Sequence, residues 1–145
     1  MPLPVPSMNN AIEPMIQKVK DTLTATGLFN DVNEGEKIYD GGTTAWVIPG
    51  PIRINSRATS TLQLNTTLYV IVMSSDPDTT PAALRKKMHP AYDAMLEDVT
   101  FDGTCWNSIP TLWHPGFVQM GEETYVGIMG QWLVITMQGY SPKGV

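Results

Sequence analysis

Residues 62–73 read LQLNTTLYVIVM, and their side chains alternate between two sets. One set carries the apolar residues Leu62, Leu64, Leu68, Val70 and Val72. The other set begins with polar residues and ends with Tyr69, Ile71 and Met73. A period of two is typical of a β-strand. The second half of this segment is apolar on both faces, which indicates that the strand is buried on both sides there. The sequence therefore predicts a central strand in a mostly antiparallel sheet with helices packed on it.

Two amphipathic helices are predicted beside this strand. Apolar residues recur at helical spacing from Ala11 to Thr26, where Pro14 is expected in the first turn. A second helix is predicted to run from Pro81 towards residue 98, with Thr80 as its N-cap. Pro90 is expected to kink this second helix or divide it into two pieces.

Other apolar segments predict further strands at residues 28–32, 45–48, 112–119 and 124–138, and the last of these is unusually long. We expect the second of these to stop at Pro49-Gly50-Pro51, and residues 53–61 to form an exposed loop or a hairpin arm. A hairpin turn is expected at residues 121–123, and Gly127 and Gly130 predict a bend or bulge in the last strand.

The predicted fold class is α+β, with a mostly antiparallel curved β-sheet and two main α-helices packed on one side. Residues 11–145 are expected to form a single domain, because this length is common for one hydrophobic core. Residues 1–10 begin with three prolines and predict a flexible N-terminal arm outside the core, which can reach a neighbouring subunit.

Composition narrows the function classes. Nine Lys and Arg against fourteen Asp and Glu give a formal charge of −5, so the basic surface of a tight nucleic-acid binder is missing. No apolar run approaches the roughly 18–20 residues that span a bilayer, and the start of the chain does not resemble a secretory signal. We therefore expect a protein made in the cytosol, with no membrane partner.

The sequence shows no constellation typical of catalysis. His89 and His114 are each followed by proline and lack the spacing of metal ligands, and the glycines do not follow a nucleotide-binding pattern. Cys105 is interpreted as a small core residue, and core packing is expected for each of the four tryptophans. We predict no enzyme activity, no catalytic residue, no cofactor and no metal.

The order of these segments resembles a known family. Residues 23–29 read LTATGLF, residues 68–72 read LYVIV, residues 91–98 read AYDAMLED, and residues 134–137 read VITM. This layout, from about Ile12 to Tyr140, is similar to the tail-terminator or tail-completion proteins of long-tailed bacteriophages, of the lambda U-like type. The likeness is one of layout, and the family offers no catalytic residues to carry over.

The resemblance implies a structural protein of the virion, located in the phage neck or tail and assembled in the host cytoplasm. It implies a homohexameric ring that caps the tail tube, stops its polymerisation and joins the tail to a head-side connector or stopper protein. DNA would pass through the acidic or neutral lumen without specific binding.

Five residues are candidate interface positions. Arg53 and Arg57 lie in the exposed segment after residue 52, and Glu122 and Glu123 lie at the predicted hairpin turn. Trp113 is the tryptophan best placed to contact a partner. The alternatives are a head-completion, stopper or other neck protein, a dimeric interaction module, and, from another class, a small ligand-binding or enzymatic domain that uses His114 and Cys105.

Overall fold

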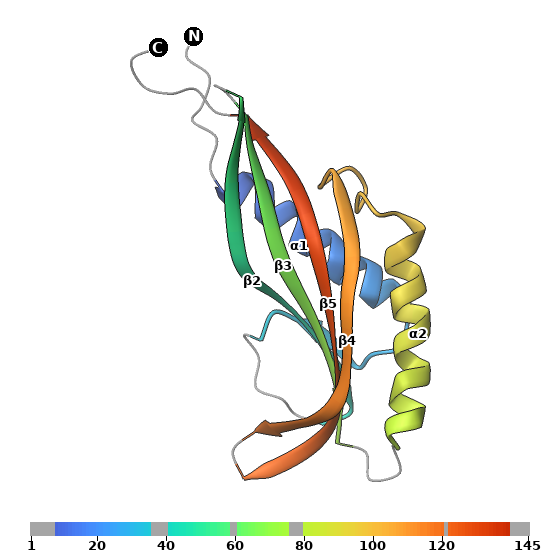
Figure 1. Ribbon diagram of the computed structural model, residues 1–145. Helices are drawn as coiled ribbons and strands as arrows, with labels where there is room; N and C mark the ends of the chain where they lie inside the picture. The colour runs from blue at the N-terminus through green and yellow to red at the C-terminus, as the bar shows by residue number, and fades with distance from the viewer. Residues whose placement is uncertain (1–7, 36–40, 59–60, 76–79, 121, 140–145) are drawn as a thin grey trace.

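The structure is a computed structural model that describes residues 8–35, 41–58, 61–75, 80–120 and 122–139. It contains two helices and one five-stranded sheet (Figure 1). The helices are α1 (Met8–Ala25) and α2 (Pro81–Glu97); the strands are β1 (Asp31–Asn33), β2 (Thr43–Ala58), β3 (Thr61–Ser74), β4 (Asn107–Met120) and β5 (Glu123–Gly139). The strand order is β1-β2-β3-β5-β4, and only the β1–β2 pair is parallel. The predicted α+β fold class is confirmed.

Strand β3 is the centre of the sheet, as its alternating sequence predicts. It pairs with β2 on one side and with β5 on the other, and the β3–β5 register runs without a shift from Thr61↔Gly139 to Ser74↔Val126. Its apolar set faces the helices, where Leu64, Leu68 and Val70 are fully buried. Strand β3 thus connects the β2–β3 hairpin to the β4–β5 hairpin within one sheet.

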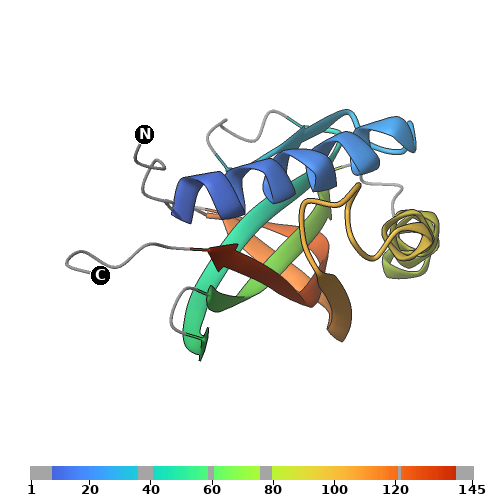
Figure 2. The same cartoon turned by 90° about the horizontal axis from the view of Figure 1, so that it is seen from above.

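Both helices pack on the same face of the sheet. Figure 2 shows α1 crossing that face with its last turns beside α2, which is seen end-on. Residues of α1 such as Met15 and Val19 join residues of α2 such as Leu84 and Met88 in one core with Trp132 of β5. Neither helix of the described residues covers the opposite face of the sheet.

The helix starts only partly follow the predictions. Helix α1 includes residues 8–10, so Pro14 is its seventh residue and the prediction that it lies in the first turn is wrong. Helix α2 has the predicted N-cap, in which Thr80 Oγ1 accepts a hydrogen bond from the backbone N–H of Ala83 at 3.1 Å. Helix α2 continues through Pro90 and is not divided by it. Proline lacks the N–H of one helical hydrogen bond, but Pro90 is exposed, so water can reach the carbonyl that this bond would otherwise occupy.

Strand β2 continues through Pro49-Gly50-Pro51, so the prediction that it stops there is wrong. Within the described residues β1 pairs only with residues 44–46 of β2, which leaves the outer edge of the following stretch without a strand partner. Proline is tolerated on such an edge because no ladder hydrogen bond needs its N–H. A register shift between Pro49 and Ile52 absorbs the irregularity, and residues 53–58 then form one strand of a hairpin arm with β3.

Strands β4 and β5 form the predicted hairpin, since β4 ends at Met120 and β5 begins at Glu123. A bulge in β5 is not found: β5 keeps its register with β3, and the irregularity lies in β4 between Pro110 and Leu112. Gly130 instead has a packing role. A Cβ atom there would lie 2.4 Å from Cζ3 of Trp132, so the glycine makes room for the indole ring.

Candidate functional site

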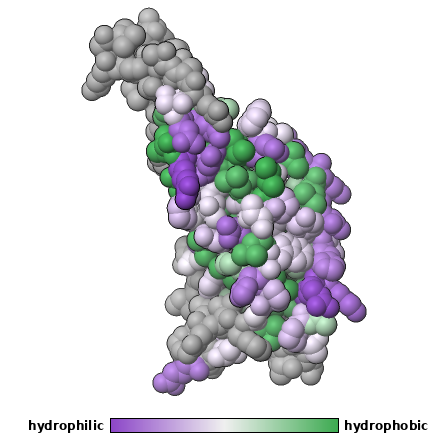
Figure 3. Space-filling view, viewed as in Figure 1, coloured by the Kyte–Doolittle hydropathy of each residue, from purple (hydrophilic) through white to green (hydrophobic). Residues whose placement is uncertain are grey.

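The face of the sheet that points away from the helices carries large apolar side chains on β4 and β5. Ile109 pairs with Leu133, next to the buried Trp132, so alternation turns both away from the core. Ile109, Leu112 and Met137 are 44%, 48% and 44% exposed. With three half-buried neighbours they form what we name the β4–β5 open face: Ile109, Leu112, Met129, Leu133, Ile135 and Met137. Figure 3 shows hydrophobic residues gathered on this side of the molecule.

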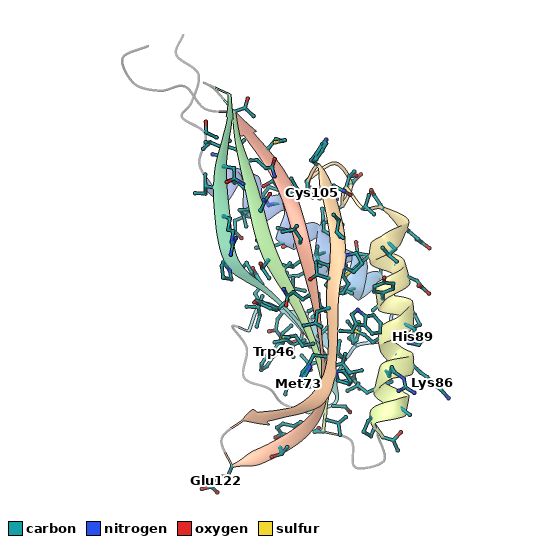
Figure 4. All side chains as sticks on the ribbon, viewed as in Figure 1. Trp46, Met73, Lys86, His89, Cys105 and Glu122 are labelled. Atoms are coloured by element: carbon teal, nitrogen blue, oxygen red, sulfur yellow. The ribbon has the colours of Figure 1, made fainter. Side chains whose placement is uncertain are left out.

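At the other end of the same face, near Met73 and Trp46, the side chains are largely buried. Met73 pairs with Gly127 and is fully buried, and Trp46 pairs with Ile71 and is half-buried (Figure 4). Large contiguous apolar patches on a protein surface are typical of interaction sites. The β4–β5 open face is therefore the strongest candidate surface for assembly.

The edge of the sheet is less suited to assembly than the face. Strand β4 is the outermost strand on its side of the described sheet, and an unpaired strand edge can add a further strand. Pro110 and Pro115 lie within β4 and have no N–H to donate. Because these prolines interrupt the row of donors, side-chain burial on the open face is the more suitable contact.

The five predicted interface residues do not lie together in one protomer. Arg53 lies exposed on the β2–β3 hairpin arm, and Glu122, labelled in Figure 4, lies exposed at the β4–β5 turn. The strand registers place the arm and the turn at opposite ends of the sheet. Arg57 lies in β2 and Glu123 is the first residue of β5, but their side chains lie outside the described part of the chain. Arg53 and Glu122 are thus separated along most of the sheet and do not form one composite site.

Trp113 lies between these ends and turns towards α2. Its ring packs edge-on against Tyr92, with 4.9 Å between ring centroids, and lies 5.6 Å from the ring of His89. The three rings line a groove of about 520 Å³ between α2 and β4. We name it the α2–β4 groove, lined by His89, Tyr92, Asp93 and residues 110–113.

The loop from α2 to β4 is held by one carboxylate. Asp98 accepts hydrogen bonds from the hydroxyl and backbone N–H of Thr100 and from the backbone N–H of Asp102. These bonds, the Thr100 hydroxyl first, lower the pKa of Asp98 below its usual value. Phe101 and Asp102 have φ of 46° and 59°, which L-residues rarely adopt. Asp98 thus stabilises the strained loop that leads into β4.

The residues of the enzymatic alternative do not come together. Cys105 is buried, its thiol donates to the carbonyl of Val99 at 3.4 Å, and burial raises its pKa to about 11. His114 lies seven residues into β4, roughly 23 Å along a strand from its start at Asn107. Among the described residues, no three His, Cys, Asp or Glu side chains are grouped as metal ligands would be.

Sequence reasoning missed the open face and misjudged one tryptophan. Core packing is confirmed for Trp132, but Trp106 is 64% exposed just before β4, so that prediction is wrong. The signal for the open face is the unbroken run Trp132-Leu133-Val134-Ile135, which is apolar on both sides of one strand. Only one of those two sides can face the helices.

The chain matches no protein-family model and no curated protein sequence. Neither helix of the described structure is long and apolar enough to cross a membrane.

Proposed function

We propose that this chain is a ring-forming structural protein of a bacteriophage tail, a tail terminator. Six copies would close into a ring that caps the tail tube, stops its polymerisation and joins the tail to the head-side connector. The observation that supports this function best is the β4–β5 open face, whose apolar side chains remain accessible in one protomer. A neighbouring copy would bury them, and burial of apolar surface is the main driving force of protein association.

A closed ring needs two different, complementary patches on each subunit. Arg53 is exposed at the base of the β2–β3 hairpin arm and pairs with Asn65, so it points to the face away from the helices, and the β4–β5 turn presents Glu122 at the opposite end of the sheet. Opposite charges at the two ends favour a head-to-tail contact and disfavour a symmetric one. The net charge of −5 suits a lumen through which DNA slides without adhering.

The function is tested with tubes of the tail tube protein from the phage that encodes the chain. The purified chain is added during tube polymerisation, and the products are examined by negative-stain electron microscopy. We expect shorter tubes that carry a ring at one end only. Tubes of unchanged length with bare ends would contradict the proposal, and rings found only on the portal side of heads would indicate a stopper protein instead.

A further inference from the structure

The α2–β4 groove offers a second kind of binding site. On one side it is lined by helix α2, and on the other by the part of β4 in which the register with β5 shifts. Thr111 Oγ1 there donates to the carbonyl of Gln131 at 3.1 Å, which ties the irregular part of β4 to its neighbour. The groove is thus formed by a helix and a strand, and its volume of about 520 Å³ is within the range of ligand-binding clefts.

Its lining is aromatic on one side and polar at the rim. Tyr92 and Trp113 pack edge to face at 87°, and His89 lies against Trp113 at an angle of 34°. The indole Nε1 of Trp113 is buried and has no hydrogen-bond partner. Buried donors are nearly always paired, and an unpaired one is costly. Because this Nε1 atom has almost no accessible surface, a ligand in the groove would pack on the rings and place its polar groups at the rim, beside Asp93 and Thr111.

Proline-rich segments match this chemistry. A polyproline II helix has no internal hydrogen bonds, so its carbonyls are free to accept, and such segments bind grooves lined by aromatic rings. Residues 1–7, which lie outside the described part of the chain, read Met-Pro-Leu-Pro-Val-Pro-Ser. Prolines at every second position favour the extended polyproline II conformation.

We propose that residues 1–7 of one copy bind the α2–β4 groove of a second copy. Geometry favours this over binding within one copy. Seven residues in polyproline II reach about 22 Å. Helix α1 has 18 residues and is about 27 Å long. The end of α1 that follows residue 7 is the one away from α2, whereas Lys18, further along, forms an ion pair with Asp102 near the end of α2 (Figure 2).

The inference rests on the self-association in the proposed function and names one contact between neighbouring copies. The main test places a photo-crosslinking amino acid at Leu3 of the full chain and mixes it with isotope-labelled chain without the crosslinker. We expect crosslinks to residues 89–93 or 110–113 of the labelled copy. Crosslinks confined to the same copy, or to other surfaces, would overturn the proposal.

A peptide titration measures binding to the α2–β4 groove independently of ring formation. A synthetic peptide of residues 1–7 is titrated into the full chain and followed by tryptophan fluorescence and calorimetry. We expect saturable binding that weakens at least about tenfold when alanine replaces the three prolines. His89→Ala should weaken binding to a similar degree, while Lys86→Ala, an exposed change on α2 outside the groove, should leave it unchanged.

The outcomes distinguish the two proposals. A chain that forms hexamers but neither crosslinks at the groove nor binds the peptide would contradict the groove proposal and would still support the ring. A full chain that remains a single protomer at every concentration would contradict both the ring and the contact between copies, even if its groove binds the added peptide. Equal loss of binding in His89→Ala and Lys86→Ala would contradict a role for the aromatic lining.

Discussion

Two isoleucines test which face of the sheet joins the copies. Ile109 on β4 is 44% exposed and lies on the open face, whereas Ile54 on β2 is 51% exposed and pairs with the fully buried Leu64, so it points to the helix side. Both are strand residues of the same type and similar exposure. Ile54→Asp and Ile109→Asp are therefore matched perturbations of opposite faces.

The magnitudes follow from burial. Full burial of an isoleucine side chain is worth about 1.5–3 kcal/mol, so the exposed part of Ile109 would contribute roughly 1 kcal/mol to each contact between copies. Ile109→Thr should accordingly weaken each contact about fivefold. Ile109→Asp would place an unpaired charge in the contact, at a cost of about 3–5 kcal/mol, which corresponds to more than about 100-fold.

Sedimentation velocity over a dilution series measures the midpoint concentration of assembly, and urea unfolding checks that each protomer remains folded. We expect Ile109→Asp to abolish assembly at concentrations where the wild-type chain and Ile54→Asp still form rings. The reasoning is refuted if Ile54→Asp is as disruptive as Ile109→Asp, or if Ile109→Asp leaves the midpoint unchanged while the protomer stays folded.

Three further predictions concern the protomer. Gly130→Ala should destabilise it by about 1–3 kcal/mol, because the new Cβ would overlap the Trp132 ring, whereas Gly116→Ala, with no atom within 4 Å, should be nearly neutral in urea unfolding. Because the pKa of Asp98 is lowered in the folded state, its stabilising contribution is present above pH 3.8 and is lost as the pH falls below it; Asp98→Asn should show a smaller loss of stability from pH 7 to pH 3 than the wild type. With a pKa of about 11, Cys105 should react slowly with a thiol reagent at pH 8 and rapidly once guanidinium unfolds the chain, and a fast native reaction would contradict the burial of the thiol.

Local sequence predicted the parts of the fold that depend on short-range patterns. The alternation in residues 62–73 gave β3 and its buried set, and Thr80 followed by Pro81 gave the start of α2. These signals depend on backbone geometry and on which side chains fit next to each other along one element. They hold whatever packs around that element.

The wrong predictions depend on neighbours that the local sequence does not show. Proline ends a strand only where its missing N–H is needed, and Pro49 follows the part of β2 that pairs with β1, so the strand continues. Gly127 and Gly130 predict a bend or a bulge in β5; the register shows no bulge there, and Gly130 makes room for Trp132 two residues further along the strand. The open face was missed for the same reason, since an apolar run shows that two faces are apolar but not which of them a helix covers.

The central claim is that copies of this chain join through the β4–β5 open face into a closed ring. Native mass spectrometry of the purified full chain across a concentration series tests it most directly. The account predicts a species of six times the 16.0 kDa protomer mass, which Ile109→Asp removes. A 16.0 kDa protomer at every concentration, or a dimer as the largest species, would contradict it.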